Sequence, residues 1–186
     1  YAVLPYLKSS SNQTRLVAVS ALGEMNARSA SGEILAMAMQ NQDREVARTY
    51  AMVLGKLGAV QSESYLLSIL RSSKDDPASA AAINALGSIK SVQAIPDLVK
   101  VMGSSYAKGR ENAVPALIAI GSPLAIPGCF LLLENDSSEI RYAASEVIYS
   151  IPSPSTAPQA LALLKKKSRS AGPASMILGH IHYKAA

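Results

Sequence analysis

A short apolar pattern recurs along this chain at a nearly constant step. It reads Ala21-Leu22-Gly23-Glu24-Met25 in its first copy and returns 32 residues later as Val53-Leu54-Gly55-Lys56-Leu57 and, after 32 more, as Ala85-Leu86-Gly87-Ser88-Ile89. Degenerate copies follow at steps of 31, 31 and 30 residues: Leu117 to Ile120, Ile148 to Ile151 and Leu178 to Ile181. Six copies predict a repeat protein, in which each unit buries its apolar face against its neighbours.

Each copy has the same apolar interior. Aliphatic residues stand one position before the glycine column and two after it, and a small residue stands five before it, which is the spacing of an apolar stripe on a helix. The small residues are Ala18, Ala82, Ala113, Ala144 and Ala174, with Tyr50 as the exception. The pattern predicts a second helix in every copy, and we expect its glycine to allow close approach of the neighbouring helix.

A separate apolar segment precedes the second helix in most copies. The segments are Tyr65 to Leu70, Ile95 to Met102, Ile126 to Leu133 and Ala160 to Leu164. Polar loops follow them, and Asp76-Pro77 has the form of a helix start, with a capping residue before a proline. Each unit is therefore predicted to be helix, loop, helix over about 31 residues. Pro115 and Pro173 fall inside predicted second helices, which we expect them to kink or shorten.

These copies resemble HEAT-like repeats, in particular the short bacterial class named after phycobilisome lyases. The matching residues, besides the Leu-Gly-x-aliphatic ending, are Arg15, Glu45-Val46, Arg110 and Glu139-Ile140-Arg141. The resemblance implies an all-α fold, a right-handed α-α superhelix (solenoid) of about six HEAT-like helix pairs. We expect a single solenoid domain over residues 1–186, with repeats at about 1–26, 27–58, 59–90, 91–121, 122–151 and 152–186. The resemblance specifies architecture and not activity.

The repeat arginines show where the copies depart from the family pattern. Arg15, Arg110 and Arg141 share one column, whereas the arginine is replaced by Ser79 and Ala171 and is shifted by one position at Arg48. In HEAT-like repeats this arginine pairs with an acidic group or a carbonyl of an adjacent repeat, so a structural role is expected. The first copy begins abruptly at Tyr1, and we expect the chain to be a piece of a longer protein.

The positive charge is confined to one end of the chain. The formal net charge is +5, yet residues 1–151 are neutral, and the excess comes from Lys165, Lys166, Lys167, Arg169 and Lys184. No apolar stretch is long enough to span a membrane. No segment resembles a signal peptide, which weakly favours a cytoplasmic location and otherwise leaves the compartment unknown.

Few residues suit catalysis or metal binding. His180 and His182 would point to different sides of a helix, and a metal site there would need further ligands. Cys129 lies in an apolar run and is expected to be a buried hydrophobe. With no phosphate loop, paired carboxylates or zinc-ligand spacing in the sequence, we predict no enzyme, no cofactor and no metal site.

The outer face of the second helices is the predicted binding surface, because a solenoid presents it as one continuous face. Its residues vary between copies while the core stays alike. We expect a protein-interaction scaffold, a monomer or a weakly self-associating chain, that binds a partner protein of unknown identity through Arg48, Met52, Asn84, Tyr142 and Glu146. The alternatives are binding of nucleic acid or another polyanion through the basic patch Lys165, Lys166, Lys167 and Arg169, which is not favoured, and activity like that of a bilin lyase or chaperone.

Overall fold

The computed structural model describes residues 2–41, 43–72, 76–165 and 169–185. Within these ranges all regular structure is helical, and no strand occurs. The chain divides into two compact units, Tyr1–Ser91 and Val92–Ala186, and each unit is described by itself below. The predicted all-α solenoid of helix pairs is confirmed.

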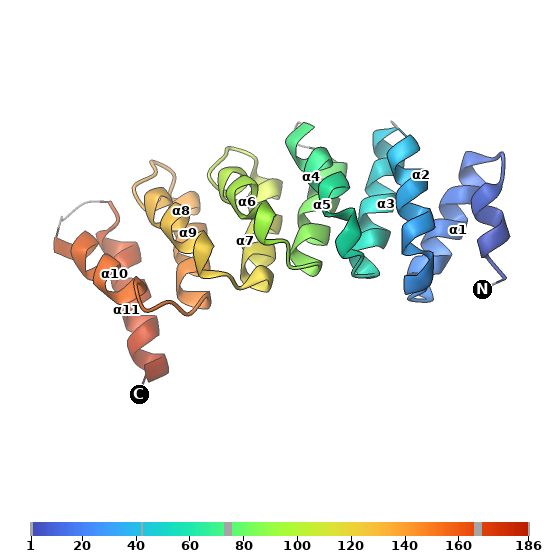
Figure 1. Cartoon of the computed structure of the whole chain (residues 1–186). Helices are drawn as coiled ribbons and strands as arrows, with labels where there is room; N and C mark the ends of the chain where they lie inside the picture. Colours follow the sequence, from blue (N-terminus) through green and yellow to red (C-terminus); the bar gives the residue numbers. More distant parts are fainter. Residues whose placement is uncertain (1, 42, 73–75, 166–168, 186) are drawn as a thin grey trace. The chain divides into compact units, whose positions relative to one another are not determined.

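The first unit contains three helix pairs, each with a shorter first helix and a longer second helix. Its elements are η1 (Leu4–Lys8), α1 (Asn12–Glu24), η2 (Arg28–Ala30), α2 (Ser31–Gln40), α3 (Arg44–Lys56), η3 (Val60–Ser62), α4 (Glu63–Ser72) and α5 (Pro77–Ser88), where η marks a 3-10 helix. The second helices contact one another in chain order, α1 with α3 and α3 with α5. They run from blue to green in Figure 1 and form one layer of this unit.

The second unit repeats the arrangement. Its elements are η4 (Val92–Ala94), α6 (Ile95–Met102), α7 (Ala107–Ile120), η5 (Pro123–Ala125), α8 (Ile126–Leu132), α9 (Ser138–Ser150), α10 (Thr156–Lys165) and α11 (Ala171–Ala185). Each first helix packs on the second helix of its own pair, and α9 contacts both α7 and α11 (Figure 1). None of the described helices has both the length and the apolar character that a membrane crossing requires.

Side-chain caps begin several second helices. The predicted start at Asp76-Pro77 is confirmed, because Oδ1 of Asp76 accepts a hydrogen bond of 2.9 Å from the backbone N–H of Ser79. Ser11 and Ser137 cap α1 and α9 in the same way, each through its hydroxyl oxygen. These caps satisfy amides that a helix leaves without an internal partner, so they fix where the second helix of each pair begins.

The two helix prolines lie at different places in their helices. Pro115 lies inside α7 and does not end it, because this helix of 14 residues continues past the proline to Ile120. Its side chain is exposed, and water can therefore reach the carbonyl that the missing N–H leaves without a partner. Pro173 lies in the first turn of α11, because that helix begins only at Ala171. Proline is tolerated in a first turn, where its N–H would have no helical partner.

The predicted small-residue column is buried throughout. Its alanines are at most 3% exposed: Ala18, Ala82, Ala113, Ala144 and Ala174. Tyr50, the one large member, is also only 1% exposed and belongs to the core of the first unit with Ile34 and Leu54. The column therefore lies in the interior in both units, whatever the size of its side chain.

The glycine column allows close helix approach in the first unit, as predicted. A Cβ atom built on Gly55 would lie 2.6 Å from Cβ and 2.7 Å from Cα of Ala85, so α3 and α5 could not pack this closely with any larger residue. A Cβ on Gly23 would lie 3.1 Å from a methyl group of Val53. Gly179 behaves differently, because a Cβ there would meet no atom of the described chain within 4 Å.

A left-handed residue ends the second helix in four copies, a feature that the sequence analysis missed. These residues are Asn26, Gly58, Lys90 and Gly121, with φ between 49° and 68°. In the first unit the next residue closes the turn, as when the amide of Ala27 donates to the carbonyl of Leu22 at 2.9 Å. The amide of Asn26 also donates to the carbonyl of Gly23 at 3.1 Å. These two hydrogen bonds form the Schellman motif, which directs the chain into the next pair.

Candidate functional site

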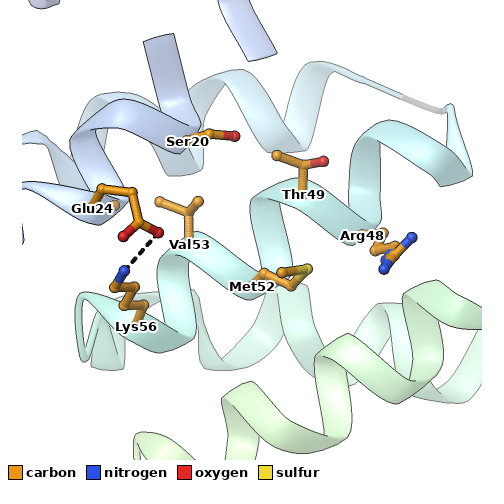
Figure 2. A pocket seen from close by; sticks show the side chains of 8 residues that line it. Ser20, Glu24, Arg48, Thr49, Met52, Val53 and Lys56 are labelled. Atoms are coloured by element: carbon orange, nitrogen blue, oxygen red, sulfur yellow. Dashed lines mark ion pairs between the residues drawn. The ribbon is translucent and has the colours of Figure 1, made fainter. Parts of the chain in front are cut away.

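A groove lies between the second helices α1 and α3 of the first unit, and we call it the α1–α3 groove. Its volume is about 320 Å³. It is lined by residues of both helices: Ser20, Gly23, Glu24, Arg48, Thr49, Met52, Val53 and Lys56. Figure 2 shows that Ser20 and Glu24 come from α1, whereas the other labelled side chains come from successive turns of α3.

The floor of the groove results from the glycine column. Gly23 has no side chain, and the methyl groups of Val53 occupy the space that a Cβ would need. Val53 is 7% exposed, whereas Met52 beside it is 54% exposed. The α1–α3 groove therefore offers an apolar floor and a flexible thioether that can adapt to what it contacts.

The two ends of the groove differ in charge. At one end Nζ of Lys56 lies 2.7 Å from Oε1 of Glu24, so these two charges compensate each other (Figure 2). Arg48 lies on the other side of Met52, is exposed, and has no ion-pair partner within the described chain. The groove thus carries one uncompensated positive charge beside an apolar centre.

The five predicted partner-binding residues fall in both units. Arg48 and Met52 line the α1–α3 groove, and Asn84 is exposed on α5 without lining it. Tyr142 and Glu146 lie one turn apart on α9 of the second unit, where Tyr142 is 56% exposed. The structure therefore brings two of the five residues together at one groove and two on one helix.

Glu24 and Lys56 belong to the groove, although the sequence analysis treated them only as part of the repeat. The signal was present, because both follow the glycine column by one residue and carry opposite charges in adjacent copies. Residues at one repeat position face each other across stacked helices, so this pattern predicts an ion pair between repeats.

The arginine column has a structural role, but with a different partner from the expected one. Nη1 of Arg15, Arg110 and Arg141 donates to loop carbonyls at distances of 2.7 to 3.1 Å. The accepting residues are Ser9 and Ser10, Ser104, and Asn135 and Asp136. These loops join the two helices of the same pair, so the arginine ties its own loop to its own second helix. Arg48, shifted from this column, lines the groove instead.

The predicted basic patch is only partly described. Lys165 is exposed at the end of α10, whereas Lys166 and Lys167 lie outside the described residues. Arg169 forms an ion pair with Asp136. One charge of this patch is therefore already compensated within the second unit.

Cys129 and His180 have packing roles, whereas the side chain of His182 lies outside the described part of the structure. Cys129 is fully buried, as predicted, and burial raises the pKa of its thiol to about 12. The ring of His180 contacts the ring of Tyr149, with centroids 4.5 Å apart and the planes tilted by 35°. Burial raises the pKa of Tyr149, with smaller contributions from Glu146 and Tyr142. No group of three or more acidic, histidine or cysteine side chains converges in the described part of the chain.

Comparison with known proteins agrees with this architecture. A crystal structure of an engineered protein has a TM-score of 0.63 at 19% identity and covers 98% of this chain and 96% of its own. A second engineered protein gives 0.62 at 18% identity, with 97% of each chain covered. The complex of CpcE and CpcF of phycocyanin lyase from Nostoc sp. PCC7120 gives 0.64 at 25% identity, covering 88% of this chain and 69% of that one.

Sequence comparison identifies the repeat family. The search of curated proteins gives no significant match. The model of HEAT repeats, by contrast, matches residues 2–87 and again 63–128, which together span more than half of the chain. With its stacked helix pairs and its glycine and arginine columns, the chain belongs to the HEAT repeat family.

Proposed function

We propose that this chain is an interaction scaffold that binds a partner protein through the outer surface of its second helices. HEAT repeats generally mediate protein–protein interaction. The observation that carries the proposal is the α1–α3 groove, where exposed Met52 and uncompensated Arg48 stand side by side over an apolar floor. Methionine and arginine are enriched in protein interfaces, whereas lysine and glutamate are depleted there.

The chemistry of the groove defines what it would bind. The space above Gly23 and Val53 suits one apolar side chain of a partner. A carboxylate next to that side chain would reach Arg48, whose planar guanidinium can hold a carboxylate through two parallel hydrogen bonds. The partner is therefore a protein segment that presents an apolar residue beside an acidic one.

Structural similarity supports a protein partner as well. The phycocyanin lyase structure contains two proteins, CpcE and CpcF, in one complex. That neighbour thus binds a second protein, at 25% identity to this chain. Asn84, Tyr142 and Glu146 would extend the contact surface beyond the groove, on the second helices of later copies.

The proposal is tested by affinity capture with matched variants. Met52→Ala and Arg48→Glu alter the groove, and Met39→Ala and Arg28→Glu make the same chemical changes at exposed positions outside it. The captured protein is then produced in pure form and titrated against all four variants. We expect each groove variant to weaken binding at least tenfold, as residues at the centre of an interface do. Equal affinities for groove and control variants would contradict the proposal.

A second candidate is an activity like that of phycocyanin lyase, which is supported by the likeness to the CpcE and CpcF complex. Such an activity requires the chain to bind a bilin. The absorption spectrum of a free bilin is measured with and without the protein. A shift and sharpening of the long-wavelength band would support this candidate, and an unchanged spectrum at saturating protein would exclude it.

A further inference from the structure

One side of α1 is apolar and is left largely uncovered by the rest of the described chain. Val17, Ala21 and Met25 follow one another at steps of four residues, so they form a stripe along one side of this helix and its end. Val17 is 59% exposed, Met25 is 44% exposed and Ala21 is half-buried. We call these three residues the α1 stripe.

The same repeat positions are covered in the later helices of the first unit. The equivalents of Ala21 are Val53 in α3 and Ala85 in α5, which are 7% and 3% exposed. Each lies against the glycine of the preceding second helix, Val53 against Gly23 and Ala85 against Gly55. The equivalents of Met25 and Val17 are also more buried: Leu57 and Ile89 are 2% and 9% exposed, Thr49 is half-buried and Ala81 is 7% exposed. The repeat itself therefore shows what fits the α1 stripe, namely the glycine side of another second helix.

The helix α11 presents such a side. Gly179 continues the glycine column and is exposed, and a Cβ atom there would meet no atom of the described chain within 4 Å. Ser175, one turn earlier on the same side, is exposed as well. The equivalent residues of α3, Ala51 and Gly55, are buried on the side of that helix that packs on α5. The α11 helix thus leaves open the side through which α3 contacts its next neighbour.

We propose that a second copy of this chain covers the α1 stripe with its α11. Gly179 of one copy lies against Ala21 of the next, as Gly55 lies against Ala85 within one chain. The contact continues the layer of second helices from one copy into another, in the geometry that the first unit already uses. It joins two different surfaces, a head on α1 and a tail on α11, so each copy can bind one neighbour at each end.

The proposed contact is small and goes beyond the proposed function. A contact made mainly by two helices falls at the low end of interface sizes, so we expect a dissociation constant of about 10 µM to 1 mM. Neither the α1 stripe nor Gly179 lines the α1–α3 groove. Binding of a partner in that groove and self-association can therefore succeed or fail separately.

The average mass of the full chain, measured by sedimentation equilibrium, tests the proposal. Over a range from about 10 µM to about 1 mM, we expect the mass of the natural chain to rise steadily above that of one chain. A mass that stays at one chain throughout this range would overturn the proposal, and the α1 stripe would then be left to a different protein.

Two variants close one end each. Val17→Glu places a carboxylate in the head and Gly179→Glu places one in the tail, where burial in the contact would remove its water. Both positions are exposed, and Gly179 has open space, so both variants should fold, which circular dichroism checks. Each variant alone should associate at least tenfold more weakly than the natural chain. An equimolar mixture should instead form a complex of two chains and nothing larger, because one open head and one open tail remain.

Matched changes on α2 serve as controls. Met39→Glu introduces a carboxylate at another exposed apolar position, and Gly32→Glu does so at another helical glycine with open space around it. Both should associate like the natural chain. Controls that dissociate as strongly as the end variants would show that charge alone prevents association. A mixture of the two end variants that stays at the mass of one chain would contradict the pairing of head with tail.

Discussion

The two units use glycine at different layers of the same architecture. In the first unit the close contacts join second helices, Gly23 against Val53 and Gly55 against Ala85. In the second unit they involve first helices, because a Cβ on Gly128 of α8 would lie 2.9 Å from a methyl group of Val99 of α6. The glycine column of the second helices is there replaced by half-buried Ile118 and Tyr149, or is open at Gly179. The layer that packs most tightly is thus a property of each unit.

The cavities of the two units differ accordingly. The α1–α3 groove lies directly over the Gly23 contact, on the face of two second helices, and it carries charge. A pocket of the second unit lies where α9 ends and α10 begins, against α11, and the described residues that line it are uncharged. One family of repeats can therefore form two chemically different pockets, depending on where the helices separate.

The largest expected effect comes from exchanging glycine for alanine at one repeat position in both units. Gly55→Ala should lower the free energy of unfolding by about 3 kcal/mol, because the new methyl group would overlap the backbone of Ala85. Gly179→Ala should raise it by up to about 1 kcal/mol, because α11 gains a better helix former in open space. Urea unfolding followed by circular dichroism measures both. Changes of the same sign would contradict the distinction between the units.

The first-helix contact of the second unit can be tested through its cysteine. Gly128→Ala should destabilise this unit by about 1 to 2 kcal/mol, since the methyl group of Val99 must move aside. The buried, unreactive Cys129 reports local opening through its rate of modification by Ellman's reagent, which we expect to rise. Adding Val99→Ala should restore part of the slow rate. A double variant as reactive as the single one would show that this contact is unimportant.

A smaller effect is expected at the left-handed turns of the first unit. Lys90 has a φ of 55°, which costs little for glycine but is unfavourable for lysine. Lys90→Gly should therefore stabilise the protein by up to about 1 kcal/mol. Lys100→Gly, the same change within α6, should destabilise it by a similar amount. Thermal unfolding distinguishes the two, and a loss of stability at both positions would show that the turn is not under strain.

The smallest effect concerns acid stability. The hydrogen bond from Arg44 is the main cause that lowers the pKa of Asp76, with a further contribution from the amide of Ser79. A lowered folded-state pKa gives stability that is present above the unfolded value of about 3.9 and is lost as the pH falls through the folded value. Asp76→Asn should therefore lower the free energy of unfolding at pH 7. In the variant, this free energy should also fall less steeply as the pH drops below about 4.

Asp136→Asn is the matched change in the second unit. It breaks the ion pair with Arg169, whose side chains are 89% and 63% exposed, against 26% and 46% for Asp76 and Arg44. Exposed pairs contribute little because water screens them. We therefore expect a smaller change in urea stability than for Asp76→Asn, and an equal or larger one would contradict this order.

Most of the fold could be predicted from sequence, because helix pairs leave local signals. The stripe around Ala18 and Ala82 repeats with the helical period, and the Asp76-Pro77 start depends only on neighbouring residues. The effect of Pro115 was misjudged because it depends on which side of α7 meets water. The left-handed Lys90 was missed because lysine gives no signal for such a turn.

The candidate sites were less predictable. Arg48 and Met52 could be assigned to an outer face by their repeat positions, but the groove beside them depends on the distance between α1 and α3. The pocket between the end of α9 and α11 had no sequence signal at all. Thr156 reads as an ordinary residue at a helix start, and its unpaired hydroxyl is a property of the surrounding packing.

The sequence by itself therefore determined the all-α class, the repeat step of about 32 residues and the side of each helix that is buried. These follow from chain-local chemistry, namely helical periodicity, capping and turn residues. Only the tertiary structure decided which glycines make contacts, where Arg48 meets an apolar floor and which buried hydroxyls, those of Tyr65 and Thr156, make no hydrogen bond within the described chain. These features depend on differences of a few tenths of an ångström in the distances between residues that lie about 30 positions apart in the sequence. No local pattern encodes such differences.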